Sequence, residues 1–227
     1  MNDNRMTTLP EDQTECWADD ECRTHTEAED QEDGDCHAEA AVREEVHWAL
    51  RRGYATRADL LEVADWTATS ADWHWLDVDR IVEDEIARAR RITETGPKVT
   101  DDLRLRLALG FCRTKGLFVG EDFCCCMGCA QAELRSIWEE RSAREDGPMP
   151  YVYFHQQDVD HVIEGGPLHL AFGAIGTVGD VSDALRFLGR ELTSTLRQCG
   201  LEVNWSGDID RRIAVNLSWE RRAPALD

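Results

Sequence analysis

The chain has 227 residues, of which 46 are Asp or Glu and 25 are Lys or Arg, so its formal net charge is −21. The negative electrostatic field of such a chain repels nucleic-acid backbones and anionic lipids. We therefore expect neither a nucleic-acid nor a membrane partner. A protein partner or a cation remains compatible with it. The length suits one domain, or one domain with a smaller attachment, and a hydrophobic content of 42% supplies a core.

The chain contains nine cysteines and no apolar run of membrane-spanning length. Its first ten residues are polar and do not resemble a secretory signal, so the expected compartment is the cytoplasm. Thiols stay reduced there, and clustered cysteines are then more often metal ligands or redox groups than disulfide partners.

Composition divides the chain into three predicted segments. Acidic residues dominate residues 1–37 and apolar residues are sparse, which predicts a disordered acidic tail. Its scattered cysteines and histidines fit no compact metal-ligand pattern. Residues 38–98 are predicted to be a helical region, and residues 99–220 an α+β domain that carries the main cysteine motif.

Apolar residues at three- and four-residue spacing predict the helices of the second segment. The first helix ends at Gly53, the second is capped by Thr56, and the third covers about residues 77–93. Residues 67–72 are predicted to be a connection. Three tryptophans around this connection are predicted to belong to an aromatic core: Trp66, Trp73 and Trp75.

The third segment alternates short apolar strands with helices. Strands are predicted at residues 117–119, 151–155, 168–172, 201–205 and 212–217, the last two forming a hairpin. Neighbouring strands are predicted to be antiparallel. The expected fold class is α+β: an N-terminal helical region followed by a mostly antiparallel sheet with helices packed on one face.

Acidic residues mark the expected starts of three helices in this segment. Asp101 or Asp102 caps the helix that precedes the first strand, and Asp158 or Asp160 opens a short helical turn. Asp180 is expected to cap a long helix that ends before the hairpin.

Four of the nine cysteines lie within residues 123–129, between a predicted strand and a helix predicted over residues 130–143. Cys126 and Cys129 form a Cys-x-x-Cys pair, and Cys125 directly precedes Cys126. This density of thiols indicates chemistry as well as packing.

Three motifs accompany these cysteines. Phe-x-Cys-Cys-x-x-Cys occupies residues 123–129, Tyr-Val-x-x-His-x-Gln-Asp occupies residues 151–158, and a Gly-Leu-x-Val-x-Trp-x-Gly hairpin occupies residues 200–207. With these motifs, residues 99–219 resemble an uncharacterised, mainly actinobacterial family of domains of unknown function. The resemblance implies a domain and candidate site positions, and it implies no activity.

On the register of that resemblance, the family cysteines are Cys125, Cys126 and Cys129, and Cys124 is an addition. The first hypothesis is a metal site, because zinc takes about four ligands and Cys-x-x-Cys supplies two of them. Cys125 or Cys124 supplies a third, both neighbours Cys125 and Cys126 binding one ion only if the loop is bent, and His155 is the expected fourth. Cys112 and His161 are weaker candidates.

Two other hypotheses remain open for these cysteines. A cysteine at a helix N-terminus has a lowered pKa, so Cys126 and Cys129 could perform thiol redox chemistry. Buried cysteines also serve simply as small hydrophobic residues. If the cysteines serve only in packing, the chain is a structural or interaction module.

His155 lies at the end of a predicted strand, where loops place functional groups. Its imidazole can bind a metal or transfer protons, or it can be a half-buried group with an ordinary hydrogen bond. Phosphate-binding glycine loops and a nucleophile elbow are not found. The expected function is a non-enzymatic binding or interaction module with a structural cysteine cluster, with zinc as the cofactor if one is bound. The alternative is a redox enzyme or sensor that uses the Cys-x-x-Cys pair.

Overall fold

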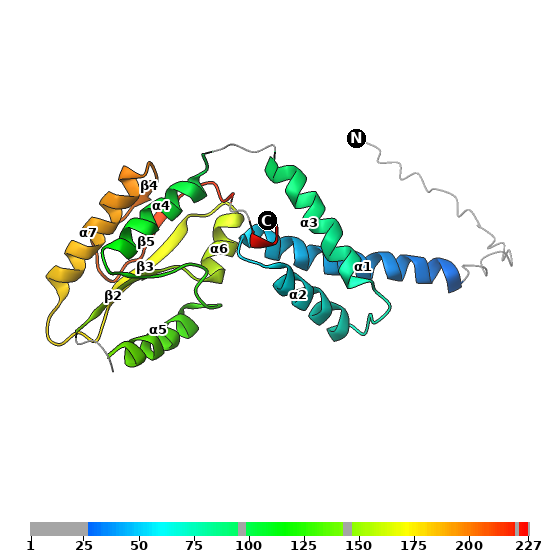
Figure 1. The fold of residues 1–227 in the computed structure, drawn as a ribbon, viewed down its shortest axis with the longest axis horizontal. Coiled ribbons are helices and arrows are strands. Elements are labelled where there is room, and N and C mark those ends of the chain that lie inside the picture. The colour runs from blue at the N-terminus through cyan, green and yellow to red at the C-terminus, as the bar shows by residue number, and fades with distance from the viewer. Residues whose placement is uncertain (1–26, 95–98, 143–146, 221–222, 227) are drawn as a thin grey trace, which may run out of the picture. The chain divides into compact units, whose positions relative to one another are not determined.

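The computed structural model describes residues 27–94, 99–142, 147–220 and 223–226 of the chain, drawn as a ribbon in Figure 1. Its packing divides the chain into two compact units, residues 1–37 and residues 38–227. Helix α1 (Glu27–Arg52) begins inside the stretch predicted to be a disordered tail. The rest of that prediction, residues 1–26, lies outside the described residues.

The helical region consists of α1, α2 (Arg57–Ser70) and α3 (Val78–Glu94). Gly53 ends α1 with a φ of 83°, a left-handed conformation that glycine adopts without strain. Thr56 caps α2 as predicted, in a capping box with Asp59. The three helices of the predicted region are therefore present.

Helix α2 continues through most of the segment that was predicted to be a connection. Its buried residues Leu60, Ala64 and Ala68 follow one another at four-residue spacing, so the last of them extends the apolar stripe into the polar stretch. The hydrogen bond from Trp73 N–H to Ala68 O, at 2.8 Å, then closes the turn. Burial of Ala68 explains why the helix does not end near residue 66.

The helical region has a hydrophobic core of its own, to which α1, α2 and α3 all contribute. Trp73 packs against this core, whereas Trp66 is 74% exposed and Trp75 is 60% exposed. The prediction of an aromatic core is thus wrong for these two tryptophans. Trp66 lies on α2 but is not one of its buried residues, and Trp75 lies in the connection between α2 and α3.

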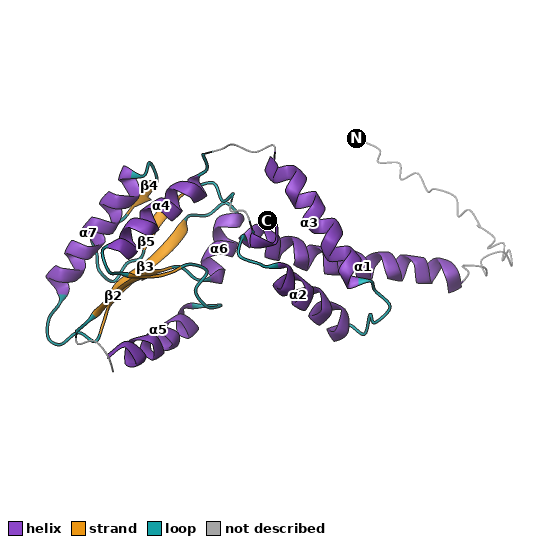
Figure 2. Cartoon of the chain, in the orientation of Figure 1, coloured by secondary structure: helices purple, strands orange, loops and turns teal. Residues whose placement is uncertain are grey.

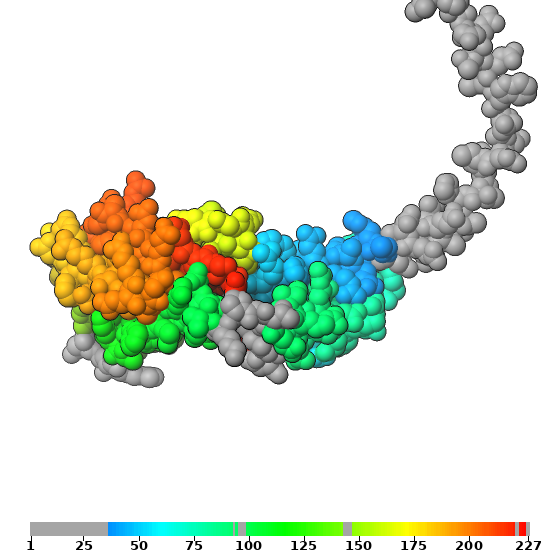
Figure 3. Space-filling model, turned by 90° about the horizontal axis from the view of Figure 1, so that it is seen from above, coloured from blue at the N-terminus to red at the C-terminus, as the bar shows by residue number. Residues whose placement is uncertain are grey.

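The C-terminal segment also joins the helical core. Ala223 and Ala225 are buried in it, and the Ala225 N–H donates to Ala55 O at 3.0 Å. Ala225 lies in a single turn of 3₁₀ helix, η1 (Pro224–Leu226). Figure 3 shows the C-terminal residues in red beside the blue atoms of the helical region. Residues before and after the sheet therefore share one core.

The remaining part of the chain forms a five-stranded sheet with the order β1-β2-β3-β5-β4. The strands are β1 (Phe118–Gly120), β2 (Met149–Tyr153), β3 (Leu168–Ile175), β4 (Glu202–Asn204) and β5 (Ile213–Asn216). Strand β1 pairs parallel to β2, and the other three pairs are antiparallel. The predicted hairpin is confirmed, because Val203 pairs with Val215.

Four helices accompany the sheet: α4 (Asp101–Thr114), α5 (Met127–Ser142), α6 (Gln156–Ile163) and α7 (Ser182–Gln198). The element order, helices first and strands later, confirms the predicted α+β fold, and Figure 2 colours the two element types separately. The predicted caps differ in detail. Thr100 caps α4, and no side chain caps α7, although Asp180 Oδ1 accepts the Ser182 N–H at 2.9 Å.

Side chains of alternate residues in β2 enter different hydrophobic clusters. Val152 packs in the larger core, with α4, α6 and α7, whereas Met149 and Tyr153 pack with α5. Because successive side chains of a strand point to opposite faces, α5 covers the face opposite to α4 and α7. Helices therefore lie on both faces of the sheet and not on one face as predicted, because α5 packs against β1, β2 and β3 from the other side.

Within the described residues, no helix combines the length and the apolar character that a membrane span requires.

Candidate metal centre

The cysteine loop, residues 121–126, connects β1 to α5 and is tied to the end of β2 by backbone hydrogen bonds. Phe123 N–H donates to Phe154 O at 2.8 Å, and Gln156 N–H donates to Cys124 O at 3.1 Å. The Phe123 ring stacks edge-on against Tyr153 at 5.7 Å between centroids. These contacts hold the loop at a fixed place beside the sheet.

Two residues of the loop adopt left-handed conformations, which bend its backbone sharply. Asp122 has a φ of 50° and Cys124 a φ of 63°. A residue with a side chain pays about 1–2 kcal/mol for this conformation. Cys124 packs against the apolar cluster beneath α5, whereas Cys125 is exposed. Because the backbone bends here, the neighbouring Cys125 and Cys126 can both bind the same ion.

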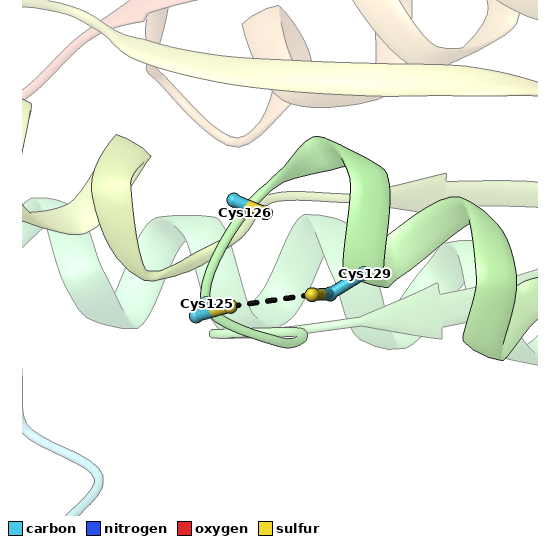
Figure 4. Close-up of side chains that lie close together, drawn as sticks. All are labelled: Cys125, Cys126 and Cys129. Carbon is cyan, nitrogen blue, oxygen red and sulfur yellow. Dashed lines mark hydrogen bonds between the residues drawn. The ribbon is translucent and has the colours of Figure 1, made fainter.

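Three cysteines converge at the start of α5. The sulfur atoms of Cys125, Cys126 and Cys129 all lie within 4.8 Å of one another. Cys125 Sγ and Cys129 Sγ are 3.4 Å apart, and Figure 4 shows these two side chains pointing toward each other. Cys125 and Cys129 are exposed and Cys126 is partly buried. This exposure disfavours the hypothesis that packing alone explains the cluster.

The start of α5 shifts the pKa values of the Cys126 and Cys129 thiols in opposite directions. The pKa of Cys126 is lowered, chiefly because the backbone N–H of Cys129 donates to its sulfur, with the Cys129 and Cys125 thiols and the Gly128 N–H adding to the effect. The pKa of Cys129 is raised to about 11, chiefly by its hydrogen bond with the Cys125 sulfur. Cys126 therefore loses its proton before Cys129 does.

Cys124 differs from its three neighbours. Burial raises the pKa of its thiol, and its side chain belongs to the apolar cluster with Phe123 and Tyr153. Cys112, a weaker candidate ligand, is buried in the larger core, and burial raises the pKa of its thiol as well. These two cysteines fit the packing hypothesis, whereas the exposed members of the cluster do not.

His155 lies in the same neighbourhood, and its ring has a structural role. It is the N-cap of α6: Nδ1 accepts the Asp158 N–H at 3.3 Å, and the Asp158 carboxylate accepts the His155 N–H at 3.2 Å. The ring is 5% exposed, and burial is the main cause that lowers its pKa. His155 is not a member of the three-cysteine group.

A partly buried ion pair supports this cap, and sequence patterns did not indicate it. Arg212 Nη1 lies 2.7 Å from Asp158 Oδ1, and the Asp158 side chain is 4% exposed. His161, a weaker candidate ligand, stacks instead on His169 with 5.6 Å between ring centroids. Arg212 lies 54 residues after Asp158, so only the folded chain brings the pair together.

A family model described as a domain of unknown function, DUF6891, matches residues 35–223 of the chain. The chain belongs to this family. No curated protein matches the chain, and no solved structure matches it. The DUF6891 match contains the cysteine loop, the sheet and most of the helical region, so it extends the resemblance seen in the sequence toward the N-terminus.

The geometry of this DUF6891 cluster is close to that of a tetrahedral thiolate site. With Zn–S bonds of about 2.3 Å, tetrahedral geometry places sulfur atoms about 3.8 Å apart. The 3.4 Å between Cys125 Sγ and Cys129 Sγ is slightly shorter than that value, and no two of the three sulfur atoms are more than 4.8 Å apart. Small side-chain rotations are therefore sufficient for Cys125, Cys126 and Cys129 to hold one thiophilic ion.

Proposed function

We propose that this chain is a non-enzymatic binding module that holds one zinc ion through Cys125, Cys126 and Cys129. The observation that supports the proposal is the convergence of three sulfur atoms at an exposed helix start. Thiolates bind zinc in preference to hard cations such as Mg²⁺ and Ca²⁺. The cytoplasm keeps thiols reduced, and reduced thiols are the form that binds the ion.

Three protein ligands leave one position of a tetrahedral ion for another donor. In structural zinc sites all four ligands come from the protein, whereas an open position takes water or an external group. His155 was the expected fourth ligand, but it is not in the three-cysteine group, and its Nδ1 accepts the Asp158 N–H. We therefore propose that water, or a side chain of a partner protein, completes the site.

A competition assay with a chromophoric zinc chelator tests this proposal on the reduced, full-length chain. We expect one zinc ion per chain, and serine at position 125, 126 or 129 should weaken its binding by more than about a hundredfold, since loss of a direct ligand exceeds the effect of losing an outer-shell partner. Cys36→Ser is the matched control, because Cys36 is an exposed cysteine of α1 outside the cluster. Equal zinc binding by Cys129→Ser and Cys36→Ser would refute the site.

The second candidate function is thiol redox chemistry, and the short distance between Cys125 Sγ and Cys129 Sγ favours it. Oxidised glutathione would accept two electrons and two protons from a pair of thiols, which leaves one protein disulfide and two molecules of reduced glutathione. The sequence indicated Cys126 and Cys129 as this pair, whereas the structure also brings Cys125 Sγ to 3.4 Å from Cys129 Sγ. Equilibration in glutathione buffers, followed by peptide mapping, distinguishes the two pairs.

A further inference from the structure

A second surface with the features of a ligand site lies between the C-terminal half of α7 and the turn that follows β4. This open groove encloses a volume of about 660 Å³, which is within the range of small-molecule sites. The side chains that matter here are Arg190, Ser194, Arg197, Gln198, Trp205 and Ser206. No carboxylate lines it, although the chain as a whole is strongly acidic.

The two arginines of the groove have no carboxylate partner among the described residues. Arg190 is exposed and makes no ion pair there, and Arg197 donates Nη2 to Val203 O at 2.9 Å. Because the two are seven residues apart on α7, they lie on the same face of the helix. The bond to Val203 fixes one guanidinium and leaves its other N–H groups for a ligand.

The indole ring of Trp205 forms one wall of the groove, and its neighbours fix its position. Its Nε1–H donates to Asp208 O at 2.9 Å, and Phe172 packs edge-on against its ring. Gly189 permits the close approach of the indole to α7, since a Cβ there would lie 2.4 Å from Trp205 Cη2. The ring is therefore held from two sides and presents its remaining surface to the groove.

We propose that this groove binds a small molecule that carries an oxyanion, a phosphate or a carboxylate, next to a planar apolar group. Arg190 and Arg197 would bind the oxyanion through charge-assisted hydrogen bonds, and the planar group would lie against Trp205. The local excess of donors explains how an acidic chain can accept an anion at this one place. The proposal is independent of the metal site.

The test uses phenyl phosphate, benzoate and neutral benzyl alcohol as probes of the ¹⁵N-labelled full-length chain. The reporter is the Trp205 indole N–H resonance, assigned with Trp205→Phe. We expect saturable shifts with at least one of the two anions and none with benzyl alcohol. The anion that binds more tightly identifies the oxyanion.

Two variants of α7 connect the shifts to the groove. Arg190→Gln should weaken binding about tenfold, because it removes a charge-assisted hydrogen bond without touching the core. Arg186→Gln on the same helix, where Arg186 is paired with Asp183 outside the groove, should bind like the wild type. No shift with either anion, a shift with benzyl alcohol of equal affinity, or unchanged binding by Arg190→Gln would overturn the proposal.

Discussion

Cys125 Sγ and Cys129 Sγ face each other at 3.4 Å across the first turn of α5. The bent loop before the helix and the regular helix after it together create this approach, because Cys125 precedes α5 and Cys129 lies within it. The relationship between these two residues determines both what the cluster can bind and how it responds to oxidation.

Mild oxidation of the metal-free chain should join Cys125 to Cys129. Their sulfur atoms need to approach by little more than 1 Å to reach the disulfide bond length of about 2.05 Å. Peptide mapping by mass spectrometry identifies the bridge, and prior addition of zinc should prevent it. A bridge that joins Cys126 to Cys129 as the main product would contradict the geometry described for the loop.

Gly120→Ala should destabilise the chain and disturb the cysteine loop. A Cβ at Gly120 would lie 2.8 Å from Phe123 Cβ and 3.0 Å from Tyr153 Cβ, atoms that cannot move without their backbone. Overpacking of this kind costs about 2 kcal/mol of the free energy of unfolding. Urea denaturation measures the loss, and zinc affinity should fall with it because Phe123 anchors the loop.

Gly110→Ala is the matched control for this substitution. Gly110 is in α4, and nothing lies within 4 Å of a Cβ built there. Replacing a helical glycine by alanine should therefore raise the free energy of unfolding by about 0.5–1 kcal/mol. If Gly110→Ala and Gly120→Ala changed stability in the same direction, the close approach at Gly120 would not be the cause.

Asp158→Asn should cost about 1–3 kcal/mol of the free energy of unfolding, because it leaves the partly buried Arg212 guanidinium beside a neutral amide. The double variant with Arg212→Leu should lose less than the sum of the two single variants. Asp183→Asn, which removes a fully exposed partner of Arg186, should leave stability nearly unchanged. Additive losses at Asp158 and Arg212 would show that the pair does not interact.

Acid should weaken the fold through His155. Burial, the largest cause, holds the pKa of His155 below the usual 6.5. Above pH 6.5 the ring is neutral in both the folded and the unfolded state, so its full contribution to the free energy of unfolding is present there. As the pH falls below 6.5, the unfolded state binds a proton that the folded state resists, and the free energy of unfolding declines through the window down to the lowered folded pKa.

His155→Asn isolates this effect, since asparagine also caps helices but does not titrate. Urea denaturation at about pH 7.5 and about pH 5.5 should show that the wild-type chain loses more stability than the variant on acidification. His169, whose pKa burial also lowers, titrates in both proteins and cancels in the comparison. A variant that loses as much stability as the wild type would assign the acid sensitivity to other groups.

Local sequence patterns predicted the elements and the cysteine cluster, because their causes are local. Three sulfur atoms within five residues can hardly lie far apart, and the expected bend of the loop is provided by Asp122 and Cys124. The hairpin followed from alternating apolar residues around a Ser-Gly-Asp turn. These features depend on spacing and turn chemistry, which a sequence displays directly.

Features that depend on distant packing could not be predicted in the same way. The exposure of Trp66 depends on which face of α2 meets the core, and Trp75 lies in the connection between α2 and α3; periodicity distinguished neither. His155 was considered as a ligand because it lies at a strand end, where loops place functional groups, whereas in the structure it caps α6 with Asp158, which Arg212 holds from another part of the chain. The groove beside Trp205 likewise combines a helix face with a turn that follows a strand.

The most direct test of the account is X-ray absorption spectroscopy at the zinc edge on the zinc-loaded chain. We predict three sulfur neighbours at about 2.3 Å and one nitrogen or oxygen neighbour at about 2.0–2.2 Å, as expected for three cysteines and an external donor. Cys129→Ser should reduce the sulfur count, and Cys36→Ser should not. A first shell made of nitrogen and oxygen alone would place the ion elsewhere and contradict the proposed role of Cys125, Cys126 and Cys129.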